Sequence, residues 1–209
     1  MTRRLRLGVL SLLTALLATA GFAPDVVRAD EQTRFDDDDS EGPLDVAAVR
    51  LRHRVFFQVS SHSKTRRRVT EIKLRLATYE KWDSELLTGR KNFIAFEFNF
   101  DDDAIRERCI VITHGEFEPR VELHRRCWTT KQEFVRVLSG HRPNGHSIVV
   151  AIDRHRLKRG LREFTWRAVT SYEDPEADRD DPCWAGTFPS PGPYGVCEDL
   201  TKARHHRFR

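Results

Sequence analysis

The stretch TEIKLRLATY, residues 70–79, alternates apolar and polar side chains with a period of two. Ile72, Leu74 and Leu76 fall on one side of such a segment, and charged residues such as Lys73 fall on the other. Because successive side chains of an extended chain point to opposite faces, this pattern predicts a β-strand with one buried face. The stretch therefore indicates a sheet that packs on a core.

The segments on either side repeat this pattern, and turn signals such as HGE, RPNG and KRG separate several of them. The strand-like runs are LDVAAVRLR, RVFFQVS, NFIAFEFNF, CIVIT, RVEL, FVRVL, SIVVAI and EFTWRAVTSY. Only YEKWDSELL and DRHRLKRG suggest helical turns. We therefore predict an all-β, antiparallel, jelly-roll-like β-sandwich of eight or nine strands with one or two short helical turns, over residues 42–172. A closed barrel is the alternative.

The first twenty residues have the layout of a secretory signal peptide. Three arginines precede an apolar run at residues 7–17, and the small residues 18–20 supply a cleavage site. Residues 27–29 offer a second site, so cleavage as late as 29 is the alternative. The apolar run is too short to span a bilayer. The pattern predicts a secreted or extracytoplasmic protein without a transmembrane segment in the mature chain.

The charge of the chain gives little indication of a nucleic-acid partner. The formal net charge is +4, and removing the three signal-peptide arginines leaves +1. Charges of both signs are interleaved along the rest of the chain, whereas nucleic-acid binding shows as a strong basic excess on one face. We expect one domain and a monomer that does not bind nucleic acid.

Four cysteines in an exported chain predict two disulfides. Of the three possible pairings, the sequence favours Cys109–Cys127 and Cys183–Cys197. The turn-like EFEP lies midway between the first two, so a hairpin centred near residue 118 would place them directly opposite each other. The second pair would close a loop rich in proline and glycine within residues 173–200. A four-cysteine zinc site would need C-x-x-C spacing, which is absent.

Three stretches carry a resemblance to a known class of domain: the acid-rich lead into GPLDV (residues 42–46), LRLATYEKW followed by SELL (residues 74–87), and FEFNFDDD (residues 96–103). Residues 36–172 resemble, in outline, small exported bacterial β-sandwich domains of the DOMON type and related carbohydrate-binding modules. The resemblance implies a module that binds a ligand or a surface, not a catalyst. The haem-binding version of these domains uses Met and His as axial ligands. The only methionine here is Met1, at the start of the predicted signal peptide, so haem ligation of that kind is excluded for the mature chain.

No catalytic motif is present: the sequence contains no G-x-S-x-G, H-E-x-x-H, P-loop or G-x-G-x-x-G. We therefore expect no enzyme. The function we predict is an exported, non-catalytic binding module for a glycan or cell-envelope polymer. The alternative is a structural or protein-interaction domain of the envelope with no small ligand.

The acidic N-terminal segment, residues 21–41, ends in FDDDDSEG and leads into the first predicted strand. Its acids match the first half of an EF-hand loop, but the twelfth position is Ala48, so an EF-hand is excluded. A calcium site at the edge of the sandwich would combine acids from three places. Its candidate ligands are Asp37, Asp39, Asp45, Asp101 and Asp103. The alternative is that each acidic run is a solvated loop.

The aromatic residues of the predicted disulfide loop are the candidates for a glycan-binding surface. Trp184, Phe188 and Tyr194 lie where burial is hard to arrange, so we predict an exposed platform there. The alternative is that they pack the loop onto the sandwich. Trp166 alternates with Phe164 in a strand and is expected in the core. Residues 201–209 form a basic tail that we expect to be disordered.

Overall fold

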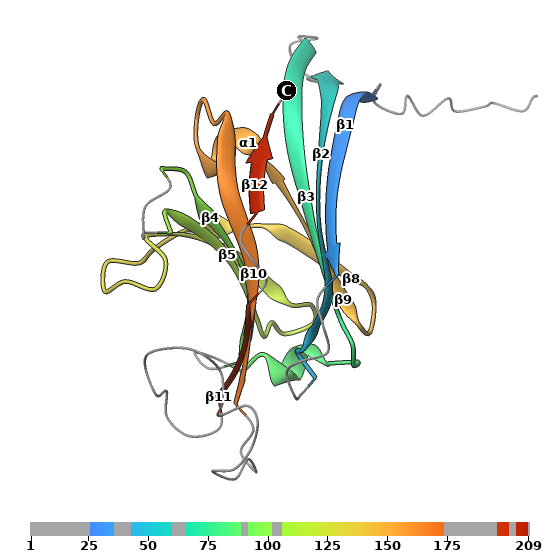
Figure 1. Cartoon of the computed structure of the whole chain (residues 1–209), viewed down its shortest axis with the longest axis vertical. Helices are drawn as coiled ribbons and strands as arrows, with labels where there is room; N and C mark the ends of the chain where they lie inside the picture. The colour runs from blue at the N-terminus through green and yellow to red at the C-terminus, as the bar shows by residue number, and fades with distance from the viewer. Residues whose placement is uncertain are drawn as a thin grey trace, which may run out of the picture.

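The computed structural model describes residues 26–35, 43–59, 66–88, 92–101, 106–173, 196–200 and 204–208. These residues form two antiparallel sheets that face each other (Figure 1). Sheet A contains, in order across the sheet, β1 (Val26–Phe35), β2 (Val46–Val59), β3 (Arg66–Thr78), β9 (Ser147–Asp153) and β8 (Ser139–Asn144). Sheet B contains, in order, β11 (Val196–Leu200), β10 (Glu163–Glu173), β4 (Phe93–Asn99), β5 (Arg108–Thr113), β6 (Arg120–Arg125) and β7 (Glu133–Val137), and β12 (Arg204–Arg207) also pairs with β10. The predicted all-β sandwich is confirmed.

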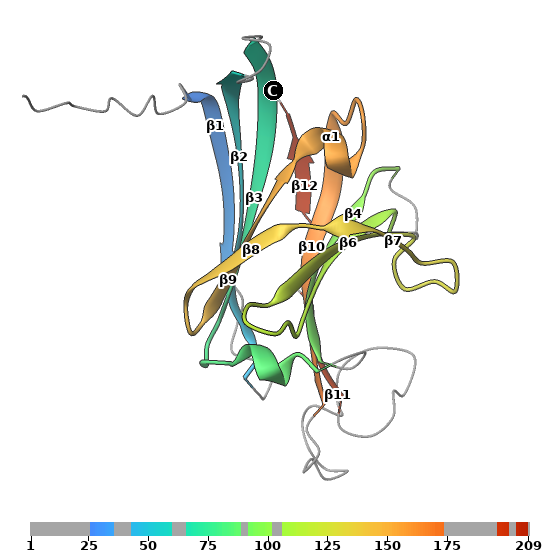
Figure 2. The same cartoon turned by 180° about the vertical axis from the view of Figure 1, so that it is seen from behind.

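Helix is limited to two short pieces in the described residues, as expected. They are the 3-10 turn η1 (Ser84–Leu86) and the single-turn helix α1 (Arg154–Leu157). The Asp153 side chain caps α1 by accepting a hydrogen bond from the His155 amide at 3.0 Å. Gly160 follows with a φ of 75°, a conformation that glycine adopts without a steric cost. Both views place α1 at the opposite end of the sandwich from β11 (Figures 1 and 2).

The core lies between the sheets because each facing strand places its alternate apolar residues inward. Ile72, Leu74 and Leu76 of β3 are fully buried, as the period-two pattern predicted. Phe96 and Phe98 of β4 meet them from sheet B. Trp166 is only 2% exposed and belongs to the same core, which confirms its predicted place.

The described chain has twelve strands, more than the eight or nine expected. LDVAAVRLR and RVFFQVS form the single strand β2, and the four strands missed are β1, β8, β11 and β12. β1 falls within the predicted acidic N-terminal segment and pairs with β2 from Val26 to Phe35. β8 contains Gly140 and Pro143, which are turn signals in a sequence but are tolerated here because β8 is an edge strand.

The expectation of a disordered basic tail is wrong for residues 204–208. β12 pairs with β10 along Glu163–Trp166, and this pairing directs His206 inward, where it is fully buried. His206 Nε2 lies 3.0 Å from Nδ1 of His53 on β2, so a hydrogen bond joins the two sheets. Phe208 packs edge-on against both imidazole rings. Tertiary pairing therefore gives structure to a segment whose composition suggested none.

The chain crosses from sheet B to sheet A between β7 and β8. Leu138 is buried at this corner, and its amide donates to the Val121 carbonyl at 2.9 Å. Two residues later a Cβ on Gly140 would lie 2.5 Å from Cγ2 of Val121. Only glycine allows β8 to pass this close to β6.

The predicted disulfide Cys109–Cys127 is present, with the two Cα atoms 5.9 Å apart. The geometry expected for it is wrong, because β5 and β6 pair Cys109 with His124 and not with Cys127. Cys127 lies beyond the end of β6, in a turn that folds back so that its amide donates to the Arg106 carbonyl at 3.0 Å. The bond therefore closes a turn over the sheet instead of joining two opposed strand residues.

Candidate functional site

The outer face of sheet B, the face turned away from sheet A, has its own buried apolar patch. Its members are Phe93, Ala95, Cys109, Val111, Cys127 and Val169. Every residue of β4 is buried, so this central strand contributes side chains to both the inner core and the outer patch. The outer face of sheet B is therefore packed, unlike the solvated outer face of an ordinary two-layer sandwich.

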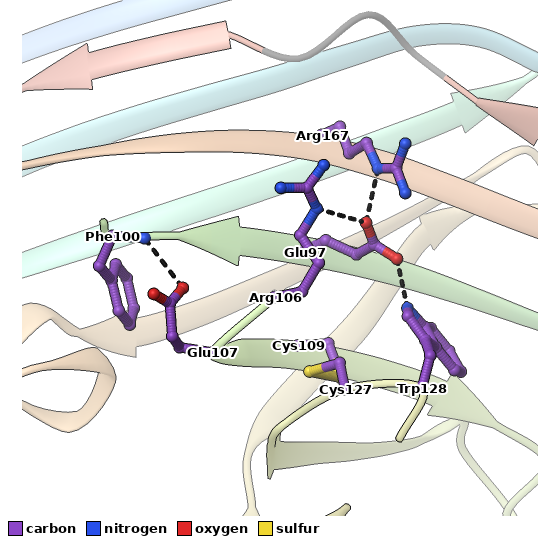
Figure 3. Close-up of polar contacts among 8 residues, drawn as sticks. All are labelled: Glu97, Phe100, Arg106, Glu107, Cys109, Cys127, Trp128 and Arg167. Carbon is purple, nitrogen blue, oxygen red and sulfur yellow. Dashed lines mark hydrogen bonds and ion pairs between the residues drawn. A yellow bond between two sulfur atoms is a disulfide. The ribbon is translucent and has the colours of Figure 1, made fainter. Parts of the chain in front are cut away.

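Glu97 lies in this patch because it alternates with Phe93 and Ala95 along β4. Its side chain is 2% exposed, which would be very costly for an uncompensated carboxylate. Arg167, directly opposite on β10, places its Nε 2.5 Å from Oε2 of Glu97. The Arg106 Nε lies 3.4 Å from the same oxygen. Two guanidinium groups thus compensate the buried charge (Figure 3).

Trp128 takes the other oxygen of Glu97, to which its indole Nε1 donates a hydrogen bond. The indole ring also packs on Phe93, with ring centroids 5.0 Å apart and planes tilted by 30°. The residue nevertheless remains 46% exposed. One edge of the indole is thus anchored on a buried charge (Figure 3). Nearly half of the residue is left to solvent.

The turn that carries Trp128 is held in a conformation that is uncommon for residues other than glycine. Arg126 and Trp128 have φ values of 53° and 62°, and Cys127 between them is bound to Cys109. Each left-handed residue of this kind costs about 1–3 kcal/mol and persists only where its surroundings fix it. Here the disulfide, the indole hydrogen bond and a 2.8 Å hydrogen bond from the Trp128 amide to Gln132 Oε1 fix it. The orientation of the indole is therefore set before any ligand arrives.

A second exposed aromatic residue shares this face. Phe134 on β7 is 55% exposed and pairs with His124 of β6, ring edge to ring face at 5.9 Å. The His124 ring bonds to the Glu122 carboxylate at 3.0 Å, and its Nδ1 lies 3.5 Å from Nε2 of Gln132. The Oε1 atom of the same Gln132 side chain accepts the hydrogen bond from the Trp128 backbone N–H. We call this region the outer aromatic face. It consists of Trp128 and Phe134 and of the polar residues beside them, Glu122, His124 and Gln132. The region thus places aromatic rings next to hydrogen-bonding groups.

The carboxylates near the disulfide serve the structure. Both oxygens of Glu97 are engaged by Arg106, Arg167 and Trp128. Glu107 Oε2 accepts the Phe100 amide at 2.9 Å (Figure 3). Both oxygens of Glu97 are thus taken up by the protein's own donors, whereas the second oxygen of Glu107, Oε1, is buried without a hydrogen-bond partner among the described residues. The group that this arrangement presents to solvent is the oriented indole.

The structure does not bring Asp45 and Asp101 together. The Asp45 carbonyl accepts the Tyr79 amide at the end of sheet A where Ala77 pairs with Ser147. Asp101 is exposed and bonds at 3.0 Å to Lys158, which follows α1 at the other end of β9. A strand of seven residues, roughly 20 Å, therefore lies between the two ends.

The other candidate calcium ligands, Asp37, Asp39 and Asp103, lie outside the described residues. Within the part of the chain that the structure describes, no group of three or more His, Cys, Asp or Glu side chains could hold a metal ion. A calcium site that includes both Asp45 and Asp101 is excluded by their separation, and a site built on the remaining acids stays a prediction. A thermal melt in EDTA and then in calcium tests it.

The predicted platform of Trp184, Phe188 and Tyr194 also lies outside the described residues, as does Cys183. The backbone of Cys197 pairs with Tyr172, but its side chain is not described, so the second disulfide stays a prediction. Trp82 and Trp166 are buried. Trp128 is thus the exposed tryptophan among those described. In the sequence, Trp128 is marked only by its position directly after a cysteine of the predicted disulfide, and this position does not indicate whether the side chain is exposed.

One feature of the sequence points to Glu97 as a residue with a partner. A charged residue stands among apolar neighbours on its side of β4, and such a residue needs a partner if that side is buried. Its partners Arg106 and Arg167 could not be foreseen, because Arg167 lies seventy residues away in the chain.

Three comparisons with known proteins give no relative for this chain: no family model matches it, and no curated protein and no solved structure matches it. Among the described residues, no helix is long and apolar enough to cross a membrane. The arrangement of side chains is therefore the basis for the function proposed below.

Proposed function

We propose that this chain is an exported, non-catalytic binding module that takes a glycan or cell-envelope polymer on the outer aromatic face of sheet B. The observation that carries the proposal is Trp128, 46% exposed and anchored through its indole nitrogen to buried Glu97. An indole offers a large, rigid and amphipathic surface, and a ring that is already oriented loses little entropy when it binds. The flat apolar face of a sugar ring suits such a surface.

The neighbours of Trp128 support a polar ligand with apolar faces. Phe134 offers a second exposed ring, and Glu122, His124 and Gln132 lie beside it with donor and acceptor groups. A ligand that stacks on the rings could bond to these groups with its hydroxyls. A wholly apolar ligand would leave them unsatisfied.

The Cys109–Cys127 disulfide supports export, because disulfides persist in oxidising compartments. The proposed leader is residues 1–20. β1 pairs with β2 from Val26 onward, so cleavage after Ala20 keeps the whole strand, whereas cleavage after Ala29 would remove its first four residues. Amino-terminal sequencing of the secreted protein tests this, and a start at Asp30 would contradict it.

The second candidate function is a protein-interaction domain of the envelope. β7 lies at the end of sheet B, and its Phe134 and Val137 are 55% and 54% exposed. An exposed apolar edge strand can pair with another chain. Sedimentation of the mature protein separates the two functions, since the binding module is expected to remain a monomer and the interaction domain to self-associate.

A glycan-array screen of the mature protein tests the proposed function. We expect wild type to bind at least one neutral glycan and Trp128→Ala to lose that binding. Phe117→Ala is the matched control, since Phe117 is 89% exposed on the turn between β5 and β6, away from the outer aromatic face. Thermal melts of all three proteins show whether they are folded. A folded Trp128→Ala variant that binds like wild type would refute the proposal.

A further inference from the structure

The outer face of sheet A, on the opposite side of the sandwich from Trp128, carries a group of cations. Leu51 of β2 and Leu74 of β3 point inward and are fully buried, so their chain neighbours point outward. Those neighbours are all basic: Arg50 and Arg52 on β2, Lys73 and Arg75 on β3. We name these four residues the basic face.

The strand register places like charges directly opposite each other. Arg50 pairs with Arg75, and Arg52 pairs with Lys73. Directly opposed like charges destabilise a sheet, whereas opposed unlike charges stabilise it. The next outward pair along the same strands, Arg54 with Glu71, obeys that rule with an ion pair of 2.8 Å.

The carboxylates on this face neutralise only part of the charge. Glu31 lies 3.3 Å from Arg50, and Asp153 lies 3.5 Å from Arg67. Glu31 is directly opposite Arg52 in the register of β1 and β2, so this one carboxylate serves both Arg50 and Arg52. Lys73 and Arg75 face only cations on β2 and the uncharged Ala151 and Val149 on β9, although Arg75 bonds to the Ser147 hydroxyl at 3.3 Å. Among the described residues, the four cations of the basic face thus share a single opposed carboxylate. A sequence that breaks a local rule without compensation does so most often where function requires it.

We infer that the basic face binds an acidic polysaccharide, a polymer that carries carboxylates at regular intervals. Outward positions repeat roughly every 6.7 Å along a strand, and neighbouring strands lie about 4.8 Å apart, so the cations form a flat array that an extended polymer can follow. Guanidinium groups suit this ligand because their planar fork bonds both oxygens of a carboxylate. Such a ligand would also relieve the repulsion between the opposed cations.

The side chains around the cations favour a polymer over a bilayer. Thr33 lies beside Arg50 on β1, and Val149 and Ala151 lie beside Arg75 and Lys73 on β9. These are short side chains that leave the charged groups foremost. Phe35, 79% exposed, is the next outward residue of β1 after Thr33, so one aromatic ring stands at the edge of the basic face and none is interleaved with the cations. The array of charge is therefore the larger feature, and the vesicle arm of the test below decides whether Phe35 makes it a lipid surface.

The test is binding of soluble polygalacturonate to the mature protein, measured by calorimetry at low and high salt. We expect Arg52→Gln/Lys73→Gln to bind at least about tenfold more weakly than wild type, as expected when two charge-assisted hydrogen bonds are lost. The melting temperature of this variant should stay close to that of wild type, because the repulsion between Arg52 and Lys73 is removed together with the attraction between Arg52 and the opposed Glu31. Arg156→Gln/Arg159→Gln is the matched control, since it makes the same charge change at two exposed residues elsewhere.

The outcomes distinguish binding at the basic face from a general attraction between a cationic protein and an anionic polymer. Loss of binding in Arg52→Gln/Lys73→Gln alone, with neutral dextran inert, supports the basic face. Equal losses in both double variants would show attraction by net charge only and overturn the inference. Binding to anionic vesicles but not to polygalacturonate would also overturn it, in favour of a lipid surface. Trp128→Ala should bind polygalacturonate like wild type, so a failure of the function proposed for sheet B leaves this test intact.

Discussion

The two outer faces of the sandwich use arginine in opposite ways. On sheet B, Arg106 and Arg167 converge on one buried carboxylate, and their side chains are 24% and 23% exposed. On sheet A, Arg50 and Arg52 are exposed and share one carboxylate, Glu31 of β1, while further cations of β3 lie opposite them. The difference shows that the residue type alone does not report a site. What matters is whether the structure has already satisfied the charge.

Each face is therefore set for a different kind of ligand. On sheet B, the charges of Glu97 and Arg167 are paired with each other within the protein. Glu97 also holds Trp128, an uncharged surface, in place. On sheet A, Lys73 and Arg75 have no opposed carboxylate among the described residues, and we propose that they meet an external partner. Substitutions on the two faces should therefore change the free energy of unfolding by different amounts and with different signs.

Replacing Glu97 with Gln should have the largest effect. It leaves Arg106 and Arg167 partly buried without a counter-charge, so we expect a loss of about 3–4 kcal/mol in the free energy of unfolding, the lower part of the range for breaking a buried pair. Urea denaturation measures it. Glu116→Gln, at an exposed carboxylate, is the control and should change stability by no more than about 0.5 kcal/mol. A Glu97→Gln variant as stable as this control would contradict the structural role of the charge cluster.

Removing the disulfide should cost slightly less. The bond closes a separation of 18 residues, which is worth about 3 kcal/mol in the chain-entropy model. Denaturation of the Cys109→Ser/Cys127→Ser variant measures this loss. Because Cys127 fixes the turn between Arg126 and Trp128, the same variant should bind the glycan more weakly than wild type. Unchanged glycan affinity would show that the hydrogen bonds to Glu97 and Gln132 orient the indole without the disulfide.

Trp128→Phe separates the ring from its anchor. Phenylalanine keeps an aromatic face but cannot donate to Glu97, so we expect a loss of about 1–2 kcal/mol in the free energy of unfolding. Residual glycan binding should exceed that of Trp128→Ala, because a ring is still present. If both variants bind equally poorly, the indole nitrogen and not the ring would be the essential feature.

Lys73→Glu should have the smallest effect and the opposite sign. It converts the opposed like charges of Arg52 and Lys73 into a pair of unlike charges, and the other strand neighbour of residue 73, Ala151, is uncharged. An opposed pair of unlike charges stabilises a sheet by about 0.2–1 kcal/mol. The rise should shrink at high salt, because exposed charges are screened. A destabilised variant would mean that the cations of the basic face do not repel one another.

The sequence allowed the sandwich to be predicted, because its strands bury one face and alternate accordingly. Ile72, Leu74 and Leu76 are the clearest case. It did not reveal β12, since RHHR has a basic composition and forms a strand only through β10 and the contact of His206 with His53. β8 was missed for a similar reason. Gly140 and Pro143 indicate a turn in the sequence, and only the structure shows that they lie in a strand at the edge of sheet A.

The candidate site was less predictable than the fold. The aromatic platform was expected at Trp184, Phe188 and Tyr194, which lie outside the described residues, whereas Trp128 was not singled out. Its exposure follows from positive φ angles at Arg126 and Trp128, which no periodicity indicates. The basic face is different, since its cations could be read from the alternation of β2 and β3, but the register that opposes them could not.

The most direct test of the account is the indole N–H resonance of Trp128 in the NMR spectrum, identified by its absence in Trp128→Phe. The mature protein is titrated first with the neutral glycan selected on the array and then with polygalacturonate. We expect the neutral glycan to shift this resonance, and polygalacturonate to leave it in place while shifting backbone amides around Arg52 and Lys73. An indole resonance that the neutral glycan fails to move would contradict the claim that Trp128 forms a binding face.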